Sequence, residues 1–242
     1  MTDPVYRTIL LFDIERFGSR DDVEQAYLRR ILYDVVDATL VTAGVEETAA
    51  LRADRGDSVM ELIDAQVSVP ALVKTLLTET PSQLHSKNRL LAASARMRLR
   101  IVLSSGYVAV DELNGWVGSD LNHAVRLLNA DILRTALKRR DDDCVLCVSN
   151  GVYEGVVRHG PLGVRPDDFH RVTVDTKEGP TVAWLHGVPF RDGAPQAPGA
   201  PSQDAVTDTP SHTSIAGDQY GVTGGTVNGD LRFDRPGRGD RR

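Results

Sequence analysis

The sequence predicts an α/β sandwich whose sheet is mixed and mainly antiparallel. Apolar runs of strand length alternate along the chain with segments in which apolar residues recur every three or four positions, as on one face of a helix. Two strand-like runs, 47–53 and 58–64, are joined only by a tight turn at 54–57. Such a short connection is typical of an antiparallel hairpin, because parallel strands need a long crossover.

The first elements follow from these patterns. Residues 6–12 form an apolar run that reads as a strand. From Asp21 onward the apolar residues return at helical spacing until Gly44 ends the segment. The apolar members of this helix are Val23, Tyr27, Leu28, Ile31, Leu32, Val35, Val36 and Leu40. Pro70 opens a second helix, which runs towards Leu91, because proline is favoured in a first helical turn.

The second half of the domain begins with a long strand at 97–110. The segment 119–139 reads as one helix, with Ser119 or Asp120 as its N-cap and Leu121, Ala124, Val125 and Leu128 packing inward. Strands are expected at 144–148, 170–175 and 181–187, and a short helix near 150–158.

The composition divides the chain into three parts. Residues 1–189 hold the elements of one domain. Residues 190–213 are rich in Pro, Ala, Ser and Asp and predict a flexible linker. Residues 214–242 bring back Tyr, Val, Leu and Phe between closely spaced glycines. This last part is either a disordered tail or a segment that adds strands to a partner protein.

The net charge of −6 gives no general electrostatic reason to bind nucleic acid or a membrane surface. No apolar run approaches the roughly 20 residues that span a bilayer, and the N-terminus lacks the order of a signal peptide. We therefore expect a cytoplasmic protein. Cys144 and Cys147 are the only cysteines, and a zinc site needs four ligands, so we expect two structural thiols in a strand.

Two aspartates lie where the backbone is predicted to turn. Asp13 closes the first apolar run, and Asp57 lies in a Gly-led turn before another strand. Two carboxylates at exposed strand ends suit a divalent cation such as Mg²⁺, which takes one or two protein carboxylates alongside the phosphates of a substrate. Gly56 would let such a ligand approach the backbone closely.

Asn122 and Arg126 are four residues apart on the helix predicted at 119–139, so they project from one face. An amide beside a guanidinium, near the positive end of a helix, can hold a ribose oxygen and a phosphate. The alternative is a solvated surface pair without a ligand.

Three segments in this order, "FDIERF", "RGDSV" and "VGSDLNHAVRLL", resemble the motifs of the class III nucleotidyl cyclases. The resemblance covers about residues 5–188 and implies the ferredoxin-like core of that family. It also implies a metal-dependent enzyme that converts a nucleoside triphosphate to a 3′,5′-cyclic mononucleotide and pyrophosphate, whose product signals to an effector.

The resemblance assigns roles at the matching positions. Asp13 and Asp57 would hold two Mg²⁺ or Mn²⁺ ions, with the Ile14 carbonyl as a further ligand. Asn122 would orient the ribose, and Arg126 would stabilise charge at the α-phosphate.

A later segment, "TKEGPTVAW", resembles the strand that carries a phosphate-binding lysine in the family, so Lys177 is the candidate. In this family the site forms between two domains, with the acids from one and the Asn, Arg and Lys from the other. One chain carries both halves, which implies a head-to-tail homodimer with two sites at the interface.

The chain departs from the family at several positions. Arg16 stands where the family usually has glycine. The nucleotide-binding positions that select a purine base hold Ala53, with Asp54 beside it, and Gly115. Neither purine pattern is present, which leaves open a pyrimidine nucleotide, as in some bacterial antiphage cyclases. It also leaves open an inactive cyclase-fold module that binds nucleotide or dimerises to regulate a partner.

Overall fold

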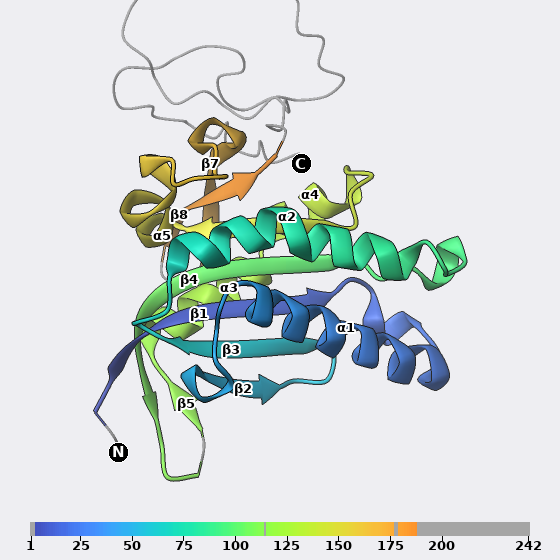
Figure 1. The fold of residues 1–242 in the computed structure, drawn as a ribbon, viewed down its shortest axis with the longest axis horizontal. Helices are drawn as coiled ribbons and strands as arrows, with labels where there is room; N and C mark the ends of the chain where they lie inside the picture. Colours follow the sequence, from blue (N-terminus) through green and yellow to red (C-terminus); the bar gives the residue numbers. More distant parts are fainter. Residues whose placement is uncertain (1–2, 114, 177–178, 188–242) are drawn as a thin grey trace, which may run out of the picture. The chain divides into compact units, whose positions relative to one another are not determined.

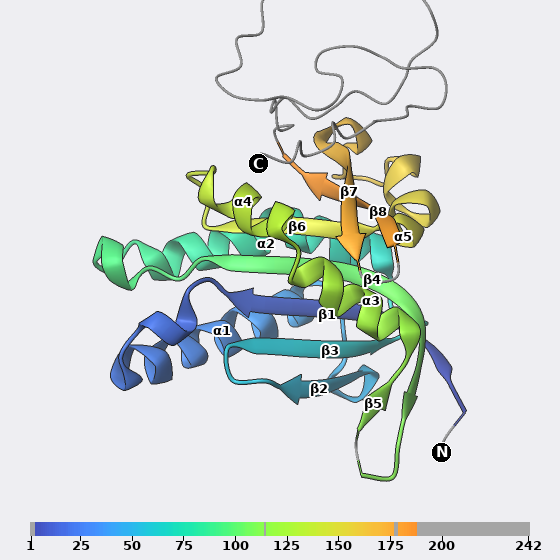
Figure 2. The ribbon, with the colours of Figure 1, turned by 180° about the vertical axis from the view of Figure 1, so that it is seen from behind.

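The computed structural model of the chain describes residues 3–113, 115–176 and 179–187. One β-sheet lies between two helical layers. Helices α1 (Asp22–Thr42) and α2 (Val69–Asn88) cover the face seen in Figure 1. Helices α3 (Ser119–Leu128) and α4 (Asp131–Lys138) cover the opposite face, seen in Figure 2. The predicted α/β class is confirmed. The linker and tail predicted for 190–242 lie outside the described residues.

The sheet has eight strands, and its main path runs β2-β3-β1-β4-β6-β8-β7. These strands are β1 (Val5–Ile14), β2 (Ala50–Asp54), β3 (Ser58–Asp64), β4 (Leu99–Val110), β6 (Cys144–Ser149), β7 (Phe169–Thr176) and β8 (Gly179–His186). A two-residue strand, β5 (Trp116–Val117), pairs with β4 off this path. Among the described pairs only β4 and β6 are parallel, so the mixed, mainly antiparallel sheet is confirmed.

Strand β1 lies inside the sheet, between β3 and β4, and from Thr8 onward it is buried on both faces. Leu10 and Phe12 pack into the core under α1 and α2. Ile9 and Leu11 pack into the second core, under α3 and α4. Burial on both faces explains why the sequence here is a continuous apolar run rather than an alternating one.

Several boundaries differ from the predictions. Val23 and Tyr27 were expected on the apolar stripe of α1 but are 80% and 48% exposed. The reason is that the first turns of α1 project past the end of the sheet (Figure 1). The helix predicted at 119–139 breaks in two, because Ala130 has extended backbone between α3 and α4. The strand predicted from 47 begins at Ala50, since 47–49 form a 3₁₀ turn.

The remaining elements lie close to their predicted ranges. Helix α5 (Asn150–Gly155) and a 3₁₀ turn at 157–159 replace the single short helix expected near 150–158. Cys144 and Cys147 are free and buried in β6, and burial raises the pKa of both thiols to about 12. They are therefore unreactive core side chains, as predicted. No helix among the described residues has the length and hydropathy that a membrane span requires.

One buried acid makes the stability of this fold depend on pH. Glu61 on β3 is 1% exposed and accepts a hydrogen bond from Arg52 on β2. Arg52 also donates to Asp37 on α1 at 2.7 Å. Burial raises the pKa of Glu61 from about 4.5 to about 7, although the charge of Arg52 opposes the shift. The neutral acid is therefore the form that folding favours.

We expect Glu61→Gln to remove part of this pH dependence. The stability due to protonated Glu61 is fully present below about pH 4.5 and is lost as the pH rises through about 7. The difference in unfolding free energy between variant and wild type should therefore grow between pH 5 and 8, by about 3 kcal/mol at most. Urea unfolding at four pH values measures it. Glu154→Gln, in an exposed pair with Arg158, is the control. The prediction would be contradicted if the unfolding free energies of wild type and Glu61→Gln changed with pH by the same amount.

Candidate active site

The two predicted acids meet at one end of the sheet. Strands β1 and β3 are antiparallel, so the end of β1 lies beside the start of β3, with Asp13 opposite Ser58. The backbone N–H of Ile14 donates to the carbonyl of Asp57 at 3.0 Å. Burial raises the pKa of Asp13 most, and the negative charge of Asp57 adds to the rise.

Asp13 is not at an exposed strand end, contrary to the prediction. It is 7% exposed and lies opposite Arg100 of β4. The Arg100 guanidinium donates from Nε to Asp13 Oδ2 at 2.9 Å and also donates to the same oxygen from Nη2. Asp57, by contrast, is exposed, as expected. Arg100 is a site residue that the sequence reasoning missed, although an arginine between the buried Leu99 and Ile101 was a visible signal.

The protonation of Asp13 depends on opposing effects. Burial is the largest and raises the pKa of the carboxyl. The charge and hydrogen bonds of Arg100 lower the pKa, and the neighbouring Asp57 raises it again. A buried carboxylate beside a second carboxylate is stabilised in its charged form only by a cation at close range. In this structure Arg100 supplies that cation.

A second arginine, Arg98, directly precedes β4 and links the segment after Asp13 to the end of α4. Arg98 Nη1 lies 3.4 Å from Glu15 Oε2, two residues after Asp13. Its Nη2 donates to carbonyls just past the end of α4, those of Arg140 at 2.7 Å and Asp142 at 3.2 Å. Arg98 therefore fixes the backbone that follows Asp13.

Arg16, which follows Glu15, stands where the cyclase motif usually has glycine. Arg16 has φ 58°, and it is the one non-glycine residue with positive φ in the described part of the chain. This left-handed backbone is the conformation that glycine adopts without cost. The Arg16 carbonyl accepts a hydrogen bond from Ser19 Oγ at 2.8 Å, which helps hold the turn. Arginine is thus accommodated with the backbone conformation that glycine would favour.

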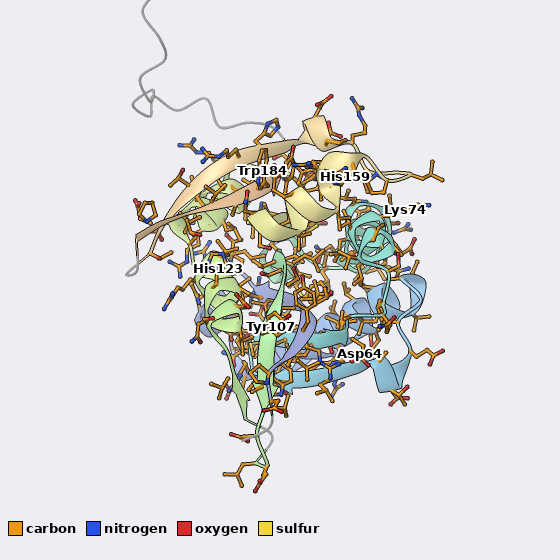
Figure 3. The ribbon with its side chains drawn as sticks, turned by 90° about the vertical axis from the view of Figure 1, so that its left-hand side faces the viewer. Asp64, Lys74, Tyr107, His123, His159 and Trp184 are labelled. Atoms are coloured by element: carbon orange, nitrogen blue, oxygen red, sulfur yellow. The ribbon has the colours of Figure 1, made fainter. Side chains whose placement is uncertain are left out.

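The residues at the acid end fit a hard divalent cation. They are two carboxylates and a main-chain carbonyl, which are the oxygen donors that Mg²⁺ and Mn²⁺ accept together with water or phosphate. The described residues hold no group of three or more His, Cys, Asp or Glu that could bind a metal unaided. Figure 3 shows that His123 and His159 lie on separate sides of the domain, so these two do not form a joint metal site. Any cation held here would need oxygens from a ligand.

Helix α3 presents the predicted Asn122 and Arg126. Asn122 is exposed, and Arg126 is half-buried and interacts with other groups. The buried side chains of the helix are Leu121, Ala124, Leu127 and Leu128. The inward face is thus confirmed: Val125 is half-buried and packs against the same core, and Leu127 is a further buried member.

The start of α3 is held tightly against β4. Asp120 Oδ2 accepts a hydrogen bond from the backbone N–H of Tyr107 at 2.7 Å. A Cβ added to Gly106 would lie 2.2 Å from Cγ and Oδ2 of Asp120, and one added to Gly118 would lie 2.6 Å from the Tyr107 carbonyl. Two glycines therefore allow the close approach, and the Asp120 hydrogen bond orients the helix.

The two halves of the predicted site are separated within one chain. Arg100 holds Asp13, and Tyr107 holds the start of α3. These two residues of β4 are seven positions apart, about 23 Å along an extended strand. Figure 2 shows the C-terminal end of β1 at the left and the start of α3 at the right of the sheet. The structure therefore does not bring Asn122 next to Asp13 in one chain.

Comparisons with known proteins place this architecture. No family model matches the sequence, and a search of curated proteins finds no match. Solved structures do match. The guanylyl cyclase Cya2 is 18% identical, with 79% of this chain and 96% of that chain covered and a TM-score of 0.53. The adenylate/guanylate cyclase/hydrolase from Silicibacter pomeroyi is 17% identical, with 77% and 99% covered and a TM-score of 0.54.

A bacterial light-regulated adenylyl cyclase is 17% identical, with 76% of this chain and 91% of that chain covered and a TM-score of 0.54. The chain has the fold of the nucleotidyl cyclase domains. At these identities the likeness concerns the fold, and it confirms the architecture that the three motifs implied.

Within this cyclase fold the predicted base-selecting residues make structural contacts. Ala53 packs partly against the core under α3 and α4. Asp54 accepts from the Gly56 N–H at 2.8 Å and from Arg29 of α1. The hydrogen bond from Gly56 is the largest cause that lowers the pKa of Asp54. Asp54 thus stabilises the turn that carries Asp57.

The other two predicted nucleotide-binding positions lie elsewhere. Gly115 is in the hairpin between β4 and β5, where its N–H donates to Asp111 Oδ1 at 2.6 Å and its carbonyl accepts from the Asp111 N–H at 2.8 Å. Lys177 lies outside the described residues.

The contact between Gly106 and Asp120 predicts a coupled pair of mutations. Gly106→Ala should lower the unfolding free energy by about 1–3 kcal/mol, because the new methyl group would overlap the Asp120 carboxylate. Asp120→Gly should cost about 1–2 kcal/mol through the lost hydrogen bond and the glycine in a first helical turn. The double variant should be about as stable as Asp120→Gly alone, since glycine lacks Cβ, Cγ and Oδ2, the three atoms of Asp120 that the new methyl group would overlap. Urea denaturation of the three variants measures this. Additive losses in the double variant would contradict the assigned contact.

Proposed function

We propose that this chain is a metal-dependent nucleotidyl cyclase, which converts a nucleoside triphosphate to a 3′,5′-cyclic mononucleotide and pyrophosphate. In this reaction the ribose 3′-oxygen bonds to the α-phosphorus, the bond to the bridging oxygen breaks, and pyrophosphate leaves. The observation that carries the proposal is the acid pair. Buried Asp13 and exposed Asp57 share one end of a sheet with the cyclase fold.

Asp13, Asp57 and the Ile14 carbonyl would hold two Mg²⁺ or Mn²⁺ ions. Bound there, the ions would activate the 3′-hydroxyl and neutralise charge on the triphosphate. Arg100 is suited to contact the same substrate. Its Nη1 is buried and has no hydrogen-bond partner among the described residues. A guanidinium with a free donor at the acid end can bind a phosphate oxygen.

The second half of the site would come from another copy of the chain. Asn122 would orient the ribose, while Arg126 and Lys177 would bind phosphates. The separation of α3 from the acid end within one chain supports this arrangement, because a head-to-tail homodimer would place α3 of one copy against the acids of the other. Such a dimer has two equivalent sites at its interface.

The base remains the open part of the proposal. Ala53 and Gly115 have no side-chain hydrogen-bonding group, and Asp54 already bonds Gly56 and Arg29. These observations argue against purine selection at these positions and are compatible with a pyrimidine nucleotide. Signalling to an effector, contact with a partner through 214–242 and a cytoplasmic location stay predictions.

One observation favours a second candidate function. Arg100 already neutralises Asp13, so the acid end is stable without any metal. A catalytically inactive cyclase-fold module that binds nucleotide or dimerises to regulate a partner would have the same feature. The two candidates differ in whether any product forms.

Product analysis with an Asp57 variant decides between them. Purified full-length protein is incubated with ATP, GTP, CTP and UTP separately, each with Mn²⁺, and mass spectrometry identifies any cyclic monophosphate. We expect one preferred substrate, and a rate loss of at least about 10³-fold in Asp57→Asn. Asp57 is exposed, so this variant should fold. Asp13→Ala is a poorer test, because it would leave the Arg100 guanidinium buried and unpaired.

Asp64→Asn is the matched control, because Asp64 lies at the opposite end of β3. It should keep near-normal turnover. Normal turnover in Asp57→Asn would exclude the acid pair from the chemistry, and no product from any nucleotide would favour the inactive module.

A mixing experiment tests the shared site. Asp57→Asn and Arg126→Ala chains should each be inactive, while their heterodimer has one site with both lesions and one with neither. The mixture should therefore recover up to about half of the wild-type activity per heterodimer. Activity is measured together with heterodimer formation, using two differently tagged chains. If heterodimers form and remain inactive, the active site is not built from two chains as proposed.

A further inference from the structure

The contact between Arg100 and Asp13 is unusually direct for two groups at a site proposed to bind cations. Strand register places them opposite each other on β4 and β1. Both Arg100 donors, Nε and Nη2, go to a single oxygen of Asp13, Oδ2. The two side chains are 11% and 10% exposed, so water screens the pair little.

A divalent cation on Asp13 would need lone pairs of this carboxylate, and one oxygen already accepts two hydrogen bonds. The guanidinium also carries a positive charge within contact distance of that oxygen. Two cations at such range in a poorly screened site repel each other strongly. While Arg100 keeps both hydrogen bonds, it therefore competes with a metal ion for Oδ2 and for the negative charge of this carboxylate.

We propose that Arg100 is a latch on Asp13, which holds the carboxylate when no metal is present and must swing away when a metal binds. This inference rests on the proposed function, because it concerns the same metal-binding acid. It assigns Arg100 a positioning role: the residue stabilises a buried acid before the ligand arrives and lowers the affinity of the site for metal alone.

The structure also provides a reason for the latch to open. Arg100 Nη1 is buried and has no hydrogen-bond partner among residues 3–113, 115–176 and 179–187. Arginine binds phosphate oxygens through two donors at once. A triphosphate at the acid end would give the guanidinium a second anion and draw it from Asp13. Metal and triphosphate would then favour each other's binding through one side chain.

Two neighbouring arginines allow the latch to be separated from a general charge effect. Arg134 of α4 lowers the pKa of Asp13 by its charge, and its own ion pair is with Asp131 at 2.9 Å. Arg98 donates to carbonyls beyond α4 and pairs with Glu15 rather than Asp13. Of these three arginines, Arg100 is the one whose hydrogen bonds reach the Asp13 carboxylate itself.

The first test measures Mn²⁺ affinity of the full chain by electron paramagnetic resonance, without nucleotide. Arg100→Gln should bind Mn²⁺ at least about tenfold more tightly than wild type, because the competing guanidinium is gone. Arg134→Gln removes one nearby positive charge without touching Asp13, so its affinity should change by less than about threefold. Equal affinities in wild type and Arg100→Gln, or equal gains in both variants, overturn the latch.

A second measurement uses the wild type, so it does not depend on the stability of a variant. Arginine labelled with ¹⁵N gives Nε–H signals, and Arg100 and Arg98 can be assigned by single substitution. Added Mg²⁺ should shift the Arg100 signal and leave that of Arg98 nearly unchanged. Tripolyphosphate with a chelator and no metal should also shift the Arg100 signal. An Arg100 signal that stays fixed under both additions overturns the latch.

The two tests also separate this inference from the proposed function. If neither wild type nor any variant binds Mn²⁺, the metal-dependent cyclase proposal fails together with the latch. If Mn²⁺ binds and a cyclic nucleotide forms, but Arg100→Gln does not change the affinity, only the latch fails.

Discussion

The ion pair between Asp13 and Arg100 allows a carboxylate to lie at the buried end of β1, whose residues 8–14 are all buried. Strand β1 is an interior strand of the sheet, with a core on each face, and its last residues are buried. An acid at that place needs a positive charge close by. Arg100 supplies it from the adjacent strand, so the geometry of the acid end follows from the pairing of β1 with β4.

Much of the architecture could be predicted because it depends on local patterns. Apolar runs located β1 and β3, three- to four-residue spacing located α1, and Pro70 as a helix start located α2. The break between α3 and α4 was missed, since it depends on extended backbone at Ala130, which carries no sequence signal of its own. Val23 and Tyr27 at the start of α1 were wrongly predicted to lie on its apolar face. Helical spacing cannot tell where a helix extends beyond the sheet that it packs against.

The site was predictable only in part, for a similar reason. Asp13 and Asp57 could be found because each ends or precedes an apolar run, and Asn122 and Arg126 because they share a helix face. Arg100 could not be paired with Asp13 from the sequence, since 87 residues separate the two and only the strand register joins them. The likeness to solved cyclases supports the fold that this register belongs to, while the assignment of chemistry to the residues rests on the acid end itself.

The anchoring of Asp57 differs from that of Asp13 in one respect. Asp57 lies in a turn held by Asp54, and Asp54 is bound in turn to Arg29 of α1. Arg29 Nη1 also donates to the Gly56 carbonyl at 3.3 Å. Asp13 is therefore held by the sheet, whereas the turn of Asp57 is held both by the hydrogen bond from Ile14 of the sheet and by Arg29 of α1. A partner that displaced α1 would therefore act through Arg29 on the turn that carries Asp57, while the ion pair of Asp13 with Arg100 stayed in place.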